Sequence, residues 1–304
     1  MGGGKFGFYL LRFYVKVFGN IATTWITRVL PSLYPEHWTV GIARGNFLKD
    51  GLKNIVVHPL PHNEFWADPF LYRYPLNNKL YLFVERFPFR EQKGLISCAE
   101  VNDKLQISKM VDILEKPYHL SYPHIIEEDE TLYMMPECSA NKKIEIYRCD
   151  EFPYKWSLYS SGMDGMSVVD TVYYRDKNGD CWLFCTVCDS AVNMHNTVMN
   201  IYKIDSLHLN SITPHKLNPI IIDSSKARNG GRIYEKEGHV YRVAQNNTFG
   251  DYGHGISIME IKKLTLEEYS EDEVMRLDGR MIQGYNYTHQ MCQIDGAFVM
   301  DLRK

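Results

Sequence analysis

Short runs of alternating apolar and polar residues dominate the chain from residue 38 onward, and stretches with a helical period are scarce. The run 65–85, FWADPFLYRYPLNNKLYLFVE, predicts a strand, a Pro/Asn turn and a second strand. The run 167–186, SVVDTVYYRDKNGDCWLFCT, repeats this plan around an Asn-Gly turn, and such a turn between alternating runs is a strong sign of a hairpin. The pattern therefore predicts a chain built from antiparallel strand pairs.

The strand pair recurs along the chain, beginning near residues 66, 121, 167, 228 and 288. The steps between these starts are 55, 46, 61 and 60 residues by subtraction. In four copies a third strand and a more polar fourth strand follow the hairpin. The predicted third strands are 95–101, 143–149, 197–204 and 256–261. Four-stranded units of this length are typical of propeller blades.

The fifth copy has only its hairpin before the sequence stops, and we expect residues 38–44, WTVGIAR, to supply its missing outer strands. That pairing would join the two ends of the chain and close a ring. The sequence therefore predicts an all-β fold, a five-bladed β-propeller over residues 37–304. A β-sandwich is the alternative, although a sandwich does not require a repeat of constant period.

The first 36 residues follow a different pattern, in which basic residues lie among aromatic and aliphatic ones and no acidic residue precedes Glu36. The basic residues are Lys5, Arg12, Lys16 and Arg28. The longest uncharged run, 17–27, is shorter than the roughly 20 residues that a membrane-spanning helix needs. Residues 1–36 are therefore predicted to form a basic amphipathic helical extension. It would lie either on an anionic membrane surface or against the propeller itself, and both alternatives stay open.

Composition narrows the possible functions. The chain of 304 residues has a formal net charge of -3, which argues against nucleic-acid binding because such proteins normally present a basic face. Aromatic residues make up 13% of the chain, and this high share favours strands or a sugar-binding surface. The N-terminal segment lacks the features of an export signal. We therefore expect a cytoplasmic protein, peripheral at the inner face of the membrane if its extension binds lipid.

The seven cysteines lie mostly in apolar, strand-like runs, and their odd number and settings predict reduced, buried thiols. Cys181, Cys185 and Cys188 are close in sequence, but on a strand Cys188 would face away from the other two. Their spacing also lacks the paired motif of structural zinc sites. The sequence contains no P-loop, no Gly-rich dinucleotide motif, and no HExxH or GxSxG motif. We therefore predict neither a metal ion nor an organic cofactor.

In a propeller the first strand of each blade lines the central channel, and sites form at one mouth of that channel. Carboxylates recur at equivalent positions of the predicted blades, where an unpaired buried charge would be costly. Asp68 and Asp170 lead these candidates, with an Asp-Pro turn as the structural alternative for Asp68. The candidates for substrate binding are His62, Glu64, Trp66, Glu85, His124, Glu137, Arg228, Asn229, Arg232, Arg242, Asn246, His254 and His289.

Two motifs resemble those of family 43 glycoside hydrolases: ADPF followed by LYLFVE in the first predicted blade, and VVDTVYYRDKNGDCWLF in the third. This resemblance implies that Asp68 is a catalytic base or nucleophile and that Asp170 tunes the acid and orients the substrate. The family also uses a fourth-blade glutamate as general acid, but the matching stretch 226–232, KARNGGR, contains no carboxylate. A sugar leaving group needs a proton donor, so this departure argues against ordinary glycoside hydrolysis.

A closer resemblance covers most of residues 38–301. The stretch 228–261, with the elements RNGGRIY and YRVAQ, is similar to the propeller domain at the N-terminus of plant glucosamine inositolphosphorylceramide transferases and to stand-alone bacterial relatives. In the plant proteins a separate glycosyltransferase domain follows the propeller, whereas this sequence stops at Lys304. The resemblance implies a carbohydrate-active propeller in surface polysaccharide or glycolipid biosynthesis.

The favoured function is a glycosyltransferase whose activated donor leaves as a phosphate, because such a leaving group needs positive charge rather than a general acid. Arg228, Arg232 and Arg242, around the Gly230-Gly231 pair, would hold that phosphate, unless they only neutralise channel carboxylates. The partners would be a sugar donor, a glycan or lipid-linked acceptor, and a membrane surface contacted through residues 5–35.

Two alternatives remain open. A hydrolase or phosphorylase of the same kind would either use Glu137 or Glu85 as its acid or use phosphate, held by the arginines, as the attacking group. A non-catalytic module would bind glycan with Trp66 and tyrosines stacked against the sugar ring.

Overall fold

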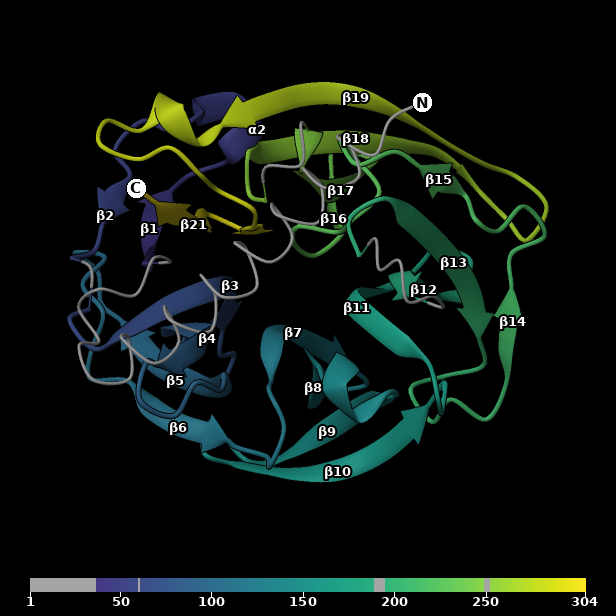
Figure 1. Cartoon of the computed structure of the whole chain (residues 1–304), viewed down its shortest axis with the longest axis horizontal. Helices are drawn as coiled ribbons and strands as arrows, with labels where there is room; N and C mark the ends of the chain where they lie inside the picture. Colours follow the sequence, from purple (N-terminus) through teal and green to yellow (C-terminus); the bar gives the residue numbers. More distant parts are fainter. Residues whose placement is uncertain (1–36, 60, 189–194, 249–251) are drawn as a thin grey trace, which may run out of the picture.

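The computed structural model describes residues 37–59, 61–188, 195–248 and 252–304, and in these ranges it shows five antiparallel sheets around a common centre (Figure 1). This arrangement is a five-bladed β-propeller, so the predicted all-β class and the blade number are confirmed. The predicted helical extension, residues 1–36, lies outside the described residues. No helix within the described ranges is long and apolar enough to cross a membrane.

Consecutive strands form each of the first four blades, with the first strand nearest the centre and the fourth outermost (Figure 1). The first blade contains β3 (Glu64–Arg73), β4 (Leu80–Pro88), β5 (Leu95–Val101) and β6 (Val111–Leu114). The second contains β7 (Ser121–Glu128), β8 (Thr131–Glu137), β9 (Ile144–Glu151) and β10 (Lys155–Gly162). The third contains β11 (Ser167–Arg175), β12 (Cys181–Cys188), β13 (Val198–Ile204) and β14 (Ile212–Pro214), with β15 (Ile221–Ile222) also paired to β13. The fourth contains β16 (Tyr234–Lys236), β17 (His239–Asn246), β18 (Gly255–Leu264) and β19 (Tyr269–Asp278).

The fifth blade joins the two ends of the propeller. Its strands, from the centre outward, are β20 (Met291–Ile294), β21 (Ala297–Arg303), β1 (Trp38–Arg44) and β2 (Val56–Val57), and a short helix, α2 (Phe47–Asp50), lies between β1 and β2. Strand β1 pairs with β21 along its whole length, from Trp38 opposite Arg303 to Arg44 opposite Ala297. The prediction that residues 38–44 complete the last blade is therefore confirmed, and β2 adds the outermost strand.

Apolar side chains fill the space between neighbouring blades. Phe70 of the first blade meets Tyr122 of the second edge-to-face, with ring centroids 5.1 Å apart. Tyr74, just after β3, stacks on Phe152 of the second blade at 3.9 Å. Such aromatic packing fixes the rotation of each blade about the centre, because a tilted blade would lose these contacts.

The cysteine-rich run 181–188 is a strand, as predicted, and the cysteines whose side chains are described are free thiols. Most of them are buried, and Cys149 is half-buried. Burial raises the pKa of Cys149 to about 11, so this thiol stays protonated at neutral pH. These cysteines therefore act as small apolar core residues.

Three inner strands carry a bulge at the same position. The pairing register shifts between Ala67 and Phe70 in β3, after Ser121 in β7 and after Val169 in β11. One residue in each bulge has a positive φ: Asp68 at 51°, Tyr122 at 46° and Asp170 at 46°. A bulge redirects a side chain that would otherwise follow the strand alternation, and a bulky residue rarely adopts this conformation. The three side chains are thus turned in the same sense at one end of the channel.

The fourth blade departs from the regular strand expected to begin near residue 228. Only Tyr234–Lys236 pairs regularly as β16, while the Gly230 amide donates to Val243 and the Gln245 amide donates to Arg228. Gly231 has a φ of +152°, and a Cβ there would lie 1.9 Å from the carbonyl oxygen of Met291. The Met291 amide in turn donates to the Gly230 carbonyl at 2.7 Å. The glycine pair therefore allows the inner strands of the fourth and fifth blades to bond directly.

We predict that Gly231→Ala destabilises the propeller by about 3 kcal/mol or more, because the new methyl group overlaps backbone atoms and the φ is unfavourable. Gly238→Ala is the matched control, since its φ of +82° is also positive but a Cβ there meets nothing within 4 Å. The control should cost about 1 kcal/mol. Urea unfolding of both variants measures the difference, and equal losses would contradict the close approach.

Candidate active site

Asp68 lies at the centre of the site because the β3 bulge turns its side chain toward the channel mouth. Its side chain is only 7% exposed. The backbone N–H of Tyr122 donates to Oδ2 at 3.1 Å, and Nε2 of His289 lies 3.0 Å from Oδ1. Both oxygens therefore accept hydrogen bonds, which is the arrangement of an ionised carboxylate rather than of a neutral acid.

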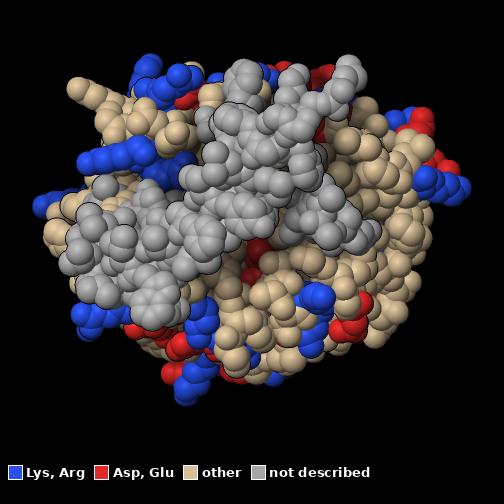
Figure 2. All heavy atoms as spheres, in the orientation of Figure 1, with Lys and Arg blue, Asp and Glu red and all other residues tan. Residues whose placement is uncertain are grey.

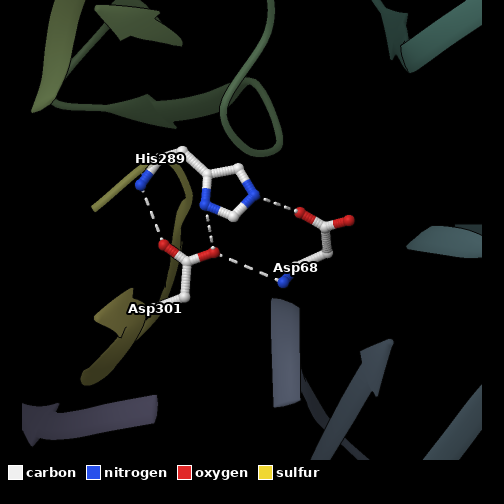
Figure 3. Close-up of side chains that lie close together, drawn as sticks. All are labelled: Asp68, His289 and Asp301. Carbon is white, nitrogen blue, oxygen red and sulfur yellow. Dashed lines mark hydrogen bonds and ion pairs between the residues drawn. The ribbon is translucent and has the colours of Figure 1, made fainter. Parts of the chain in front are cut away.

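His289 bridges Asp68 and a second buried carboxylate, Asp301 of β21 (Figure 3). Nδ1 of His289 lies 2.9 Å from Oδ2 of Asp301, in an ion pair whose hydrogen-bond alignment is poor. The backbone N–H groups of His289 and Gln290 donate to Oδ1 of Asp301 at 2.9 and 3.0 Å. Burial by itself would lower the pKa of His289, but Asp301 and Asp68 outweigh it and raise that pKa to about 10. His289 is therefore an imidazolium at neutral pH.

The second half of the site is built around Asp170, which occupies the β11 bulge. The Nε–H of Arg228 and the side-chain amide of Gln245, the latter at 2.8 Å, both donate to its Oδ2. Nη1 of Arg228 donates to Oδ1 of Asn196 at 2.9 Å. Burial opposes the charge on Arg228, but Asp170 outweighs it and raises the pKa of the guanidinium well above its usual value. Asp170 and Arg228 therefore form a fixed, charged pair.

Glu137 ends β8 beside this pair, and its side chain is 10% exposed. The Ser139 hydroxyl donates to its Oε1 at 2.8 Å, and its Oε2 lies 4.0 Å from Nη2 of Arg228. Burial and the negative charge of Asp170 raise the pKa of Glu137 to about 8, although Arg228 acts in the opposite direction. Because Asp170 takes the shorter contact with Arg228, Glu137 keeps its proton at neutral pH.

Two tyrosines join the halves of the site. The Tyr122 hydroxyl donates to the Gly231 carbonyl and accepts from the Gly231 amide, while its own amide holds Asp68. The ring of Tyr252 lies 4.9 Å from that of His289, and the Arg228 guanidinium lies 5.2 Å from the Tyr252 ring centroid. Burial, and then the carboxylates of both halves, raise the pKa of both phenols well above the usual value. Asp68 and Asp170 therefore act on the same two side chains from opposite sides.

Acidic atoms are visible at the bottom of a hollow near the centre of the face drawn in Figure 2. Two further predicted residues lie beside the two aspartates. The Asn229 side chain donates to the carbonyls of Asp170 and Phe184, each at 2.9 Å, and so holds the β11 bulge in place. Glu85 contacts the His119 ring at 3.3 Å, and burial lowers the pKa of His119 although the charge of Asp68 raises it.

Other predicted residues lie away from the two aspartates. His62 is exposed ahead of β3. The Trp66 indole N–H donates to Glu64 at 2.9 Å, and Glu64 pairs with Arg86, which also binds Asp112 of the outer strand β6. Trp66 and Glu64 thus belong to a surface network of the first blade.

The two remaining arginines also point elsewhere. Arg242 is fully buried within the fourth blade, where Glu271 binds its guanidinium at 2.7 Å. Arg232 donates to the Ile125 carbonyl at 2.8 Å, across the channel. Only Arg228 of the expected arginine cluster reaches the aspartates.

Three further predicted residues interact with groups other than the two aspartates. His124 faces the Tyr173 carbonyl at 3.4 Å, and burial followed by the charge of Arg232 lowers its pKa to about 3, so it is neutral. The side-chain oxygen of Asn246 accepts from the Thr248 amide at 3.1 Å. His254, at the turn before β18, lies close enough for its charge to act on Asp278.

Four residues of the site were not among the sequence candidates: Tyr122, Gln245, Tyr252 and Asp301. Tyr122 had a detectable signal, because SYPH in β7 matches ADPF in β3 position by position. Asp301 is a lone acid in the apolar strand AFVMDLR, which is also a recognisable signal. Gln245 and Tyr252 had no such signal, since the folding of the chain alone places them there.

Among the described residues, Asp68, His289 and Asp301 form one group whose donor atoms all lie within 4.8 Å of one another, as in a metal site. Each ring nitrogen of His289 faces a different carboxylate, Nε2 with Asp68 at 3.0 Å and Nδ1 with Asp301 at 2.9 Å. The three residues therefore form an ion-paired cluster in this structure.

Comparison with known proteins connects this propeller to a family. Residues 55–289 match the model of the N-terminal region of glucosamine inositolphosphorylceramide transferase 1. The chain is 34% identical over 212 residues to the protein of that name from Oryza sativa subsp. japonica, and 34% identical over 218 residues to that from Arabidopsis thaliana. These alignments cover 69% and 71% of the chain but only 28% of each plant protein.

Solved structures share the fold. A thermostable family-43 glycoside hydrolase has a TM-score of 0.55 at 14% identity, with 78% of this chain and 87% of that one covered. A family 117 glycoside hydrolase from the marine bacterium Zobellia galactanivorans has a TM-score of 0.54 at 10% identity, with coverage of 88% and 90%. At these identities the likeness establishes the fold alone.

We predict that Glu137→Gln changes the pH dependence of stability. The folded-state pKa of Glu137 is raised to about 8 from an ordinary 4.5, so the wild type loses stability as the pH rises between these values. The glutamine variant has no proton to lose and should gain roughly 2–4 kcal/mol relative to wild type from pH 4 to pH 9. Urea unfolding at both pH values measures this. Glu100→Gln, in an exposed pair with Lys79, is the control, and equal behaviour of the two variants would contradict the buried neutral acid.

Proposed function

Because the chain belongs to the family of the glucosamine inositolphosphorylceramide transferase 1 N-terminal region, we propose that it is a carbohydrate-active enzyme that acts on a glycosidic bond at the channel mouth. One observation carries this proposal: two carboxyl groups of one buried site are held in opposite protonation states. Asp68 accepts hydrogen bonds with both oxygens, whereas Glu137 retains its proton. Glycosyl chemistry uses one carboxylate and one carboxylic acid in this way.

In this proposal Glu137 is the general acid, in place of the fourth-blade glutamate that this sequence lacks. It protonates the departing sugar oxygen, while Asp68 acts on the anomeric carbon or on the attacking hydroxyl group. Asp170 raises the pKa of Glu137 and, with Arg228, presents fixed charge to the sugar hydroxyls. The ring of Tyr252, between the two halves, offers a surface against which a sugar can pack.

The plant relatives are named as transferases of glucosamine and inositolphosphorylceramide, so a glycan or a lipid-linked sugar is the proposed class of substrate. The chain spans only about 28% of the length of those relatives, and their complete activity is therefore not carried over. The cytoplasmic location and the lipid contact through residues 5–35 also stay predictions.

A second candidate is sugar transfer from a donor that leaves as a phosphate. Arg228 favours it, because this cation occupies the part of the fourth blade where a hydrolase would have its acid. However, Asp170 and Asn196 already bind two of its nitrogens, and Glu137 lies near the third. A phosphate would have to displace these partners, so the geometry supports the acid and base proposal better.

We predict that Asp68→Asn and Glu137→Gln each lower turnover by about 10²–10⁴-fold while the protein stays folded, because each removes one half of the acid and base pair. The assay mixes purified protein with panels of neutral oligosaccharides and of nucleotide sugars, and it reads both thermal shift and product formation. Arg228→Ala is included to separate the candidates. Stabilisation only by nucleotide diphosphates, lost in that variant, would overturn the proposal in favour of the phosphate donor. Unchanged turnover in Asp68→Asn would exclude both candidates.

We also predict that turnover falls as the pH rises through about 8, because Glu137 then loses the proton that it must donate. A pH–rate profile with any substrate found in the screen measures this limb. A rate that stays constant from pH 7 to pH 9.5 would show that Glu137 is not the acid.

A further inference from the structure

The contact between Asp68 and His289 joins the first blade to the fifth, which are the blades nearest to the two ends of the propeller chain. Asp68 lies in the first blade, and His289 and Asp301 lie in the fifth (Figure 3). We propose that His289, held in place by Asp301, is a positioning residue that pairs with the Asp68 carboxylate and fixes its orientation at the channel mouth. This inference rests on the proposed function, because Asp68 is one of the residues that the proposed function uses.

Asp301 holds both the main chain and the imidazole ring of His289. It is fully buried, and its Oδ1 accepts the amides of His289 and Gln290. Its Oδ2 faces the His289 ring and also accepts the Asp68 amide at 3.4 Å. One carboxylate thus connects the bulge that carries Asp68 to the strand segment that carries His289. A buried charge with this many partners is costly to move, so the connection is rigid.

Aromatic rings confine the imidazole. Trp38 of β1 lies 4.3 Å from the His289 ring, and Tyr252 lies 4.9 Å from it. A Cβ on Gly253 would come within 2.8 Å of the Trp38 ring, so the tryptophan is itself closely packed. Rotation of the His289 side chain would break two ion pairs and both ring contacts. Nε2 therefore stays directed at Oδ1 of Asp68.

The charges around His289 favour its protonated form. The groups that face it are Asp68 from β3, Asp301 from β21, the Tyr252 phenol and the Trp38 ring. Two carboxylates and two neutral aromatic groups surround one imidazole, so the proton is held even though burial opposes it.

This arrangement distinguishes the two oxygens of Asp68. Oδ1 faces a cation, whereas Oδ2 meets only the neutral amide of Tyr122. Of these two contacts only the one at Oδ1 is an ion pair, so Oδ2 is the oxygen suited to meet a sugar.

The test compares His289→Gln with the matched control His215→Gln. Glutamine at 289 can still donate a hydrogen bond to Asp68 but carries no charge. His215 is equally buried, but its Nδ1 accepts the Leu217 amide and no carboxylate contacts it within the described residues. In His289→Gln kcat should fall by about tenfold or more, with KM little changed, because the Asp68 carboxylate loses its charged partner. In His215→Gln kcat should stay unchanged. An unchanged kcat in a folded His289→Gln protein would overturn the inference.

A second measurement needs no substrate. In protein labelled with ¹⁵N at histidine, both ring nitrogens of His289 should remain protonated at pH 8.5, and Asp68→Asn should lower the midpoint of its titration by about 1 unit or more. A neutral His289 ring at pH 8 would overturn the inference regardless of activity. If Asp68→Asn keeps full turnover, the proposed function fails instead, and the two failures are thereby distinguished.

Discussion

The pairing of β1 with β21 is the interaction on which the rest of the structure depends. It joins residues from the two ends of the propeller, from Trp38 opposite Arg303 to Arg44 opposite Ala297. This pairing completes the fifth blade, because β1 covers the edge of β21 that would otherwise stay unpaired. It also brings the fifth blade against the first, which places His289 within 3.0 Å of Asp68. Without this closure the Asp68 half of the site would be incomplete.

The bulges convert this scaffold into a site. An ordinary inner strand would alternate its side chains between the two sides of a blade, and the shifted register at Asp68, Tyr122 and Asp170 turns three of them toward the mouth. A positive φ at a non-glycine residue is unfavourable, and its recurrence in three blades shows that tertiary packing maintains it. In the fourth blade two glycines take the same place and let the backbone approach the fifth blade.

Burial then assigns the protonation states. Asp68 and Glu137 are both carboxyl side chains in the same water-poor region. Asp68 has an imidazolium and an amide as partners, whereas the nearest cation to Glu137 is already paired with Asp170. Burial by itself favours the neutral form of a carboxyl group, and Glu137 keeps that form because its nearest cation is paired with Asp170. This difference connects a fold shared by many sugar-processing proteins to a specific proposal about the present chain.

The sequence by itself determined the strand pairs, the repeat and the closure by residues 38–44, and it picked out Asp68 and Asp170 as candidates. These features follow from local alternation, turn chemistry and repetition, which a chain carries in its own order. It did not determine the partners. Asp301 and Tyr252 join the site only because blades far apart in sequence meet at the centre. Arg232 and Arg242 bind the Ile125 carbonyl and Glu271 instead of the aspartates. Which side chains meet, and which of them keep a proton, was decided by the tertiary structure, since both depend on the distance, burial and charge of groups that are remote along the chain.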